Sequence, residues 1–133
     1  MKKQKICIIG GSLTGLITAI TLSKLDLDIH LVTNNIKENF KVDRTIAISH
    51  DNFNYIKKLN ISNFTKNQFW PCSKMKLYTK DQKKKFLKIF ELENNRNQKE
   101  KILYIMKNSV FIESMVKKIK KIKSIKFFNN EKI

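Results

Sequence analysis

The chain has 133 residues, enough for one domain of ordinary size, and its three Gly and one Pro argue against a turn-rich all-β sandwich or barrel. Two Cys exclude a disulfide-dense secreted scaffold. No run of 18 apolar residues occurs, which argues against a standard transmembrane helix.

The formal charge of +17 comes almost entirely from Lys, because only Arg44 and Arg96 are arginine. Nucleic-acid-binding proteins rely on arginine for bidentate contacts to bases and phosphates. Lys, Asn and Ile are all abundant, as expected from AT-rich coding DNA. We therefore interpret the charge as compositional and expect no specific nucleic-acid partner.

The first elements in chain order predict a βαβ unit. Residues 5–10 form a nearly continuous apolar run that predicts a buried strand, and a glycine-containing loop follows over residues 10–15. Apolar spacing predicts a helix over residues 16–25, and residues 27–32 predict a second buried strand. This order indicates an α/β fold class with a Rossmann-like nucleotide-binding unit.

The rest of the chain predicts a second helix, a hairpin, a third helix and a final strand. Two alternating runs flank Asp81 and Gln82, which predicts a β-hairpin. The clearest amphipathic helix is predicted over residues 110–122, and a strand over 124–128. The other predicted segments are a polar loop (34–43), an extended stretch (46–49), a helix containing Phe53, Ile56 and Leu59, a turn at Trp70–Cys72 and a charged loop (94–101).

The N-terminus superficially resembles a signal peptide, with a basic start and 17 uncharged residues over 6–22. Gly10, Gly11 and Ser12 interrupt that apolar stretch, and no A-x-A cleavage site follows it. We therefore expect a cytoplasmic location. In that compartment Cys7 and Cys72 are expected to be free thiols, with Cys7 in the core of the first strand.

The strongest chemical signal is the loop between the first strand and the first helix. The dinucleotide-binding fingerprint is G-x-G-x-x-G, in which the first Gly makes a tight turn and the third permits close packing of helix on strand. Ser12 replaces the middle Gly, a mild departure because Ser is small and its hydroxyl can donate to phosphate. An ordinary tight turn is the alternative interpretation. The candidate cofactor-binding residues of this loop are Gly10, Gly11, Ser12, Leu13, Thr14 and Gly15.

The fingerprint also expects an acidic residue at the end of the second strand, where it holds ribose hydroxyls. This sequence has Thr33 there, followed by Asn34 and Asn35. Thr33 or Asn34 could hydrogen-bond a ribose more weakly than a carboxylate. A simple strand-ending turn is the alternative.

Several segments together resemble one protein family. Residues 6–33 resemble the FAD-binding start of flavin-dependent aromatic hydroxylases, and four later segments resemble the ubiquinone-biosynthesis hydroxylases among them. These are residues 43–49 (D-R-x-x-A-L-S), 55–61 (xxLxxLGxW), 73–81 (I-x-x-M-x-V-x-D) and 103–110 (G-Y-V-V-E-N-x-V). Asn60, Leu103 and Lys107 depart from the Gly, Gly and Glu of those patterns.

The resemblance implies FAD as cofactor, NAD(P)H as reductant, and hydroxylation of a polyprenylated aromatic ring with O2. It places Arg44 near the phosphate or ribityl part of FAD and Asn108 near the cofactor at the start of the last long helix. A surface pair of Arg44 with Asp43 and a plain helix cap at Asn108 are the alternatives. No catalytic side chain and no metal-ligand cluster is expected, since the cofactor carries the chemistry.

The resemblance further implies that residues 1–133 form a partial FAD-binding domain, about a third of such an enzyme. The hairpin at 74–90 would begin a substrate-side sheet, and the expected partner is the missing C-terminal portion of the same enzyme. The chain alone is expected to be too short for activity. For this enzyme a cytoplasmic location with peripheral association with the inner membrane is expected. The alternatives are a self-contained nucleotide-binding module and a basic protein that uses residues 110–128 on acidic partners or membrane surfaces.

Overall fold

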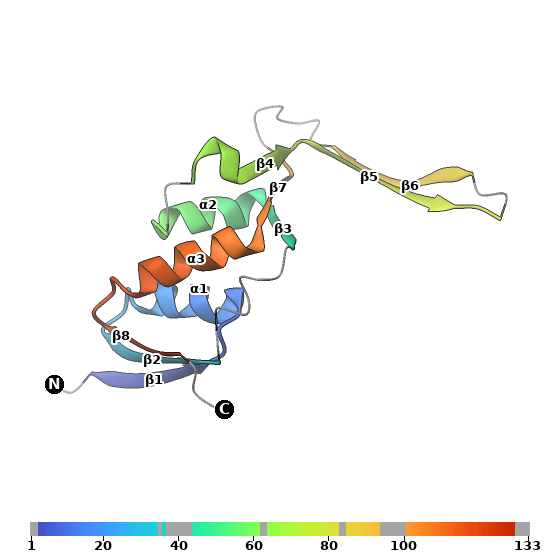
Figure 1. Cartoon of the computed structure of the whole chain (residues 1–133). Coiled ribbons are helices and arrows are strands. Elements are labelled where there is room, and N and C mark those ends of the chain that lie inside the picture. The colour runs from blue at the N-terminus through green and yellow to red at the C-terminus, as the bar shows by residue number, and fades with distance from the viewer. Residues whose placement is uncertain are drawn as a thin grey trace.

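The computed structural model describes residues 3–34, 36, 44–61, 64–82, 85–93 and 101–129. Its fold is mixed α/β, as the sequence predicts, with helices packed on a parallel sheet and a hairpin that extends away from them (Figure 1). The elements are β1 (Gln4–Ile9), α1 (Leu13–Leu22), β2 (Leu27–Thr33), β3 (Thr45–Ser49), α2 (His50–Lys58), the 3-10 turn η2 (Lys66–Gln68), β4 (Phe69–Cys72), β5 (Lys74–Lys80), β6 (Phe86–Glu93), β7 (Leu103–Lys107), α3 (Asn108–Ile119) and β8 (Ile125–Asn129).

The first sheet has the strand order β1-β2-β8, and all of its described pairings are parallel. Parallel neighbours require a crossover connection, and α1 supplies it between β1 and β2. Helix α1 packs on this sheet, and α3 packs against α1 (Figure 1). The βαβ unit predicted from the sequence is therefore confirmed.

The core lies between this sheet and the two helices. Leu16 and Ile20 of α1 meet Ile29 and Leu31 of β2, and all four side chains are fully buried. Within the described ranges, no helix covers the opposite face of the sheet (Figure 1), and Ile9 of β1 is 65% exposed. Lys5, Cys7 and Ile9 are exposed and Ile6 and Ile8 are only half-buried, so the prediction of a fully buried first strand is wrong. Cys7 is exposed and does not belong to the core.

A second sheet has the order β3-β7-β4 with antiparallel pairing, and it leads directly into α3. The prediction of a turn at residues 70–72 is wrong, because Phe69–Cys72 form the edge strand β4. Pro71 is tolerated there because an edge strand has one side free of ladder hydrogen bonds. Phe53 of α2 stacks on Tyr104 of β7 with ring centroids 4.0 Å apart, which fastens α2 to this sheet.

The hairpin is confirmed at the predicted position, and its strands β5 and β6 pair with each other in an antiparallel register. The register shifts between Leu77 and Tyr78, which marks a β-bulge. The predicted loops at 34–43 and 94–101 fall almost entirely outside the described residues. Among the described residues, no helix has the length and apolar character needed to span a membrane.

Candidate functional site

The glycine loop joins the carboxyl end of β1 to the amino end of α1. Gly10 has φ = +123°, a conformation that L side chains rarely adopt. Its N–H donates a 2.9 Å hydrogen bond to the carbonyl of Val32, which holds the loop at the end of β2. The loop thus turns sharply at the edge of the sheet where ligands of parallel α/β folds bind.

Gly15 lies inside the first turn of α1 and permits a close backbone approach. A Cβ atom at this position would lie 2.3 Å from the carbonyl oxygen of Gly10 and 3.8 Å from Ile8. No flexible side chain is available there to move aside. Only glycine therefore allows the helix to begin so close to the strand, which is the packing role that the fingerprint assigns to its third Gly.

Gly11 has a milder constraint. A Cβ there would meet side-chain carbons of Thr33 and Ile36 at 3.2–3.3 Å. These neighbours are tight, but they belong to side chains rather than backbone. The three glycines therefore differ in what they contribute, with the backbone conformation at Gly10 and the close approach at Gly15 as the strict requirements.

The amino ends of α1 and α3 have no side-chain cap. Ser12 and Lys107 occupy the two N-cap positions, and neither side chain makes a capping hydrogen bond. Neither helix has an acidic residue in its first turn. The first N–H groups of each helix lack partners within the helix, so both ends carry partial positive charge that favours an anion.

These two helix ends face one cavity of about 410 Å³ together with the start of β3. The backbone N–H of Asn108 donates a 2.8 Å hydrogen bond to the carbonyl of Arg44, which fixes the two segments against each other. Among the residues that the structure describes, no acidic residue lines the cavity. Its lining residues are Ser12, Leu13 and Thr14 from the glycine loop and α1, Arg44, Thr45 and Ile46 from the start of β3, and Asn108 and Ile112 from α3.

Five of the nine predicted cofactor-binding residues thus line one cavity, namely Ser12, Leu13, Thr14, Arg44 and Asn108. Gly10, Gly11 and Gly15 shape the backbone beside it. The alternative pair of Arg44 with Asp43 falls outside the described residues. The alternative role of Asn108 as helix cap is wrong, because Lys107 holds the N-cap position and Asn108 is the first residue of α3.

The ninth residue, Thr33, lies elsewhere. Its side chain is fully buried, and its hydroxyl donates to the side-chain oxygen of Asn129 at 3.1 Å. The same Asn129 oxygen accepts from the N–H of Ile36 at 3.1 Å. Thr33 thus joins β2 to β8, and the expectation that its hydroxyl meets a ribose is corrected. Asn34, the second residue named for that role, is exposed at the end of the strand.

A second, more apolar cavity of about 380 Å³ adjoins the first and shares Leu13, Thr14 and Ile46 with it. Its remaining walls come from α1, β3, α2 and Phe111 of α3. At its rim the hydroxyls of Thr21 and Tyr55 lie 2.9 Å apart. Sequence reasoning missed this cavity, and it missed Thr45, Ile46 and Ile112 of the first one. The only sequence signal for these residues is that they lie close in the chain to Arg44 or to the start of the last helix.

The described residues include no group of three or more His, Cys, Asp or Glu side chains placed to hold a metal ion. The lining of the cavity supports recognition of an anion. It offers backbone N–H groups, a guanidinium and small polar side chains, which together match a phosphate or diphosphate.

No protein-family model matches the sequence, and no curated protein matches it. The fold does match solved structures. The 2-methyl-3-hydroxypyridine-5-carboxylic acid oxygenase superposes with a TM-score of 0.70 at 14% identity, over 98% of this chain and 32% of that one. The p-nitrophenol 4-monooxygenase PnpA from Pseudomonas putida DLL-E4 gives 0.67 at 12% identity, over 96% and 32%.

PqsL from Pseudomonas aeruginosa, described as a probable FAD-dependent monooxygenase, gives a TM-score of 0.72 at 8% identity, over 97% of this chain and 33% of that one. At these identities the likeness establishes the fold. The chain spans about a third of the length of these structures, and its fold corresponds to the N-terminal portion of FAD-binding monooxygenases.

Proposed function

We propose that this chain binds the diphosphate of FAD and forms the N-terminal part of a flavin-dependent aromatic monooxygenase. The observation that carries the proposal is the convergence of two uncapped helix ends and Arg44 on one cavity. The likeness of the fold to solved monooxygenases supports the same assignment.

The residues that line the cavity fit the diphosphate of FAD. The N–H groups at the start of α1 would donate to one phosphate, where Gly15 lets the helix end come close to the loop. The guanidinium of Arg44 presents a planar fork to phosphate oxygens, which a lysine cannot reproduce. Asn108 lines the same cavity beside Arg44 and offers a side-chain amide. When bound, FAD supplies the electron transfer and the oxygen activation.

The finer proposal is hydroxylation of a polyprenylated aromatic ring in ubiquinone biosynthesis, with NAD(P)H as reductant and a cytoplasmic location. It is supported by the segments at 43–49, 55–61, 73–81 and 103–110 that resemble those hydroxylases. In this proposal the other two thirds of the enzyme supply the ring end of the flavin site, and β5 and β6 begin the substrate-side sheet.

A self-contained nucleotide-binding module is the second candidate. It would use the same 410 Å³ cavity, which the glycine loop, α1, β3 and α3 line. Both candidates require a diphosphate at the same site. They differ in whether the chain retains FAD tightly by itself.

Isothermal titration of the 133-residue chain with FAD, ADP and riboflavin tests the proposal. We expect FAD and ADP to bind and riboflavin to bind far more weakly, because riboflavin lacks the phosphates. Replacing Arg44 by Lys should weaken FAD binding about tenfold or more, since a charge-assisted hydrogen bond is lost. The thermal midpoint should stay near that of the parent because Arg44 is exposed.

The matched control is Lys123→Gln, which removes a charge from an exposed position away from the cavity. It should titrate FAD like the parent. Equal affinity for FAD and riboflavin, or unchanged FAD affinity in both Arg44→Lys and Arg44→Ala, would contradict the assignment. Very tight retention of FAD by the purified monomer would favour the self-contained module.

A further inference from the structure

A third cavity, of about 440 Å³, lies between α3 and the segment that follows α2. It shares no lining residue with the two cavities beside the glycine loop, so the proposed function leaves it without a role. Its lining residues on α3 recur every three to four positions and therefore lie on the helix face opposite the buried core residues. Together with one residue just past the helix end, they are Val110, Glu113, Ser114, Lys117, Lys118 and Lys121.

The third cavity is basic. Three of its lining residues are lysines, and Glu113 is the one acid among the described residues that line it. Glu113 pairs with Lys117 at 2.7 Å, and within the described ranges neither Lys118 nor Lys121 has an ion-pair partner. The carboxyl ends of α2 and α3 each contribute about half an elementary negative charge, which together do not cancel the charges of Lys118 and Lys121. The lining therefore carries a net positive charge.

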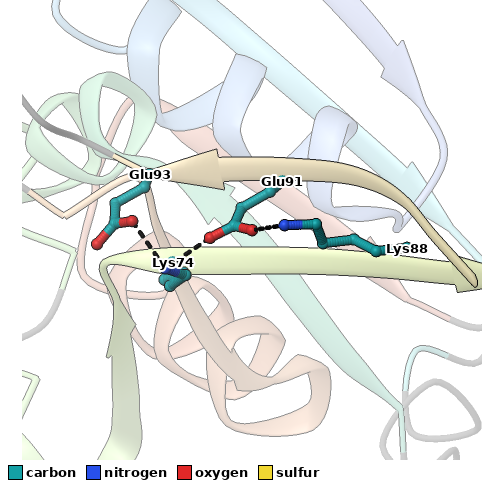
Figure 2. A network of polar contacts seen from close by, with 4 residues as sticks. All are labelled: Lys74, Lys88, Glu91 and Glu93. Carbon is teal, nitrogen blue, oxygen red and sulfur yellow. Dashed lines mark hydrogen bonds and ion pairs between the residues drawn. The ribbon is translucent and has the colours of Figure 1, made fainter.

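The ion pairs of the hairpin show how lysines are neutralised elsewhere in the chain. Lys74 contacts both Glu91 and Glu93 (Figure 2), and Glu91 also contacts Lys88. The third cavity instead places three lysines around one carboxylate, and Lys118 is half-buried there. Covering this surface with another part of the protein would remove water from ammonium groups that lack a counter-charge, which costs free energy. The lining therefore suits a ligand that brings its own negative charge better than a contact between domains.

The rest of the lining is uncharged. The side-chain oxygen of Gln68 in η2 accepts a 3.0 Å hydrogen bond from the N–H of Thr65, which leaves its NH2 group as a donor. Ile61 after α2 is buried, and Val110 is half-buried. The cavity thus combines cationic, amide and apolar walls. Such walls fit a ligand that has one anionic group on an uncharged body.

We propose that the third cavity binds a small organic phosphate, with the phosphate group at Lys118 and Lys121. A phosphate monoester carries a charge of about −1.5 to −2 at pH 7, which matches the charges of these two lysines. Lysine binds phosphate as a point charge and needs no fixed planar geometry. The volume of about 440 Å³ exceeds what a bare phosphate ion fills, so the uncharged walls receive the organic part. The inference does not depend on FAD binding.

NMR titration of the 15N-labelled full chain with phenyl phosphate, inorganic phosphate and phenol tests this proposal. We expect phenyl phosphate to shift the amide signals of Ser114–Lys121 until they saturate. Inorganic phosphate should bind more weakly, and phenol should leave these signals in place. Lys118→Gln should weaken phenyl phosphate binding about tenfold, since a charge-assisted hydrogen bond is lost. Lys121→Gln should weaken it about fivefold, because Lys121 is more exposed than Lys118.

Lys120→Gln is the matched control, because it removes an exposed charge next to Lys121 from a position outside the cavity lining. Arg44→Lys is the control for the anion site beside the glycine loop. Both variants should bind phenyl phosphate at Ser114–Lys121 like the parent, and circular dichroism should confirm that all variants are folded. A chain that binds phenyl phosphate in this way but binds no FAD would contradict the proposed function alone.

Three results would overturn the proposal. Shifts confined to the glycine loop would place phenyl phosphate in the cavity proposed for FAD. Equal affinity in the parent, Lys118→Gln and Lys120→Gln would assign the binding to the general charge of the chain. Binding of single-stranded RNA that Lys118→Gln weakens, with no response to phenyl phosphate, would assign these lysines to a nucleic-acid surface.

Discussion

At the scale of single residues, Gly15 is the most demanding position in the glycine loop. In Gly15→Ala the new methyl would meet the backbone oxygen of Gly10 at 2.3 Å, so α1 or the loop must move. We expect a loss of about 2 kcal/mol or more in unfolding free energy, together with weaker FAD binding. Denaturant unfolding followed by circular dichroism measures the first effect.

Gly11→Ala is the comparison for that variant, because its methyl meets only side-chain carbons at 3.2–3.3 Å. It should stay within about 1 kcal/mol of the parent. If the two variants unfold at the same denaturant concentration, the close approach of Gly15 to the Gly10 carbonyl does not make alanine more costly there than at position 11.

Thr33 provides a residue-scale test of a different kind. Its buried hydroxyl donates to Asn129, while the Asn129 oxygen also accepts from Ile36. Thr33→Val keeps the shape and removes one hydrogen bond, so we expect a loss of about 1 kcal/mol in stability. FAD affinity should not change. A clear loss of FAD affinity without loss of stability would restore Thr33 to the ribose site.

The fate of the predicted site residues shows what a sequence can indicate at this scale. Glycine spacing is a local property, and it placed the loop correctly. Arg44 and Asn108 are far apart in sequence, and only the antiparallel pairing of β3 with β7 brings them together. Thr33 sits where the fingerprint expects a ribose ligand, and nothing local reveals that Asn129 takes its hydroxyl. Contacts between residues far apart in the sequence therefore explain both why Arg44 and Asn108 share one cavity and why the ribose role predicted for Thr33 is wrong.

At the scale of elements, the strands and helices were predictable because each has a clear periodicity, while their ends were not. Helix α1 begins at Leu13 rather than Leu16, since Gly15 allows the turn and the helix to overlap. Trp70–Cys72 reads as a turn because Pro removes a donor, yet it forms a strand at the sheet edge, where that donor is not needed. Edge positions depend on strand order, which periodicity does not contain.

The ion pairs of the hairpin predict a pH dependence at this scale. Lys74 and Lys88 lower the pKa of Glu91 from 4.5 to about 2 in the folded hairpin. A lowered carboxyl pKa contributes stability above its unfolded value, and that contribution disappears as the pH falls through the folded value. We expect the hairpin to lose order between about pH 4.5 and 2. Cross-strand NMR contacts between β5 and β6 measure the change.

Two variants isolate the cause of that transition. Glu91→Gln should remove most of this pH dependence, because it leaves no carboxylate between the two lysines. Glu113→Gln, which breaks the pair with Lys117 on α3, should leave the hairpin transition in place. An unchanged transition in Glu91→Gln would assign it to another group.

At the scale of the whole molecule, the charge of +17 should lower stability through self-repulsion. Raising NaCl from about 0.02 to 0.5 M shortens the screening length to a few ångströms, so we expect the thermal midpoint to rise by a few degrees. A triple variant, Lys120→Gln, Lys121→Gln and Lys123→Gln, removes exposed charge and should show a smaller rise. An equal rise in parent and variant would point to a general salt effect.

Catalysis is also a property of the whole molecule, and the proposed site accounts for only part of it. A flavin hydroxylase must hold the flavin ring, exclude water and place the aromatic substrate beside it. The cavity of this chain offers anion contacts, and the similar solved chains are about three times as long.

We therefore expect the 133-residue chain with FAD, NADPH and a prenylated phenol to incorporate no 18O from 18O2 into the phenol. Mass spectrometry measures this against a reaction with free FAD, which controls for oxygen chemistry in solution. Incorporation above that control would show that these residues complete a catalytic site, and Arg44→Ala should then abolish it.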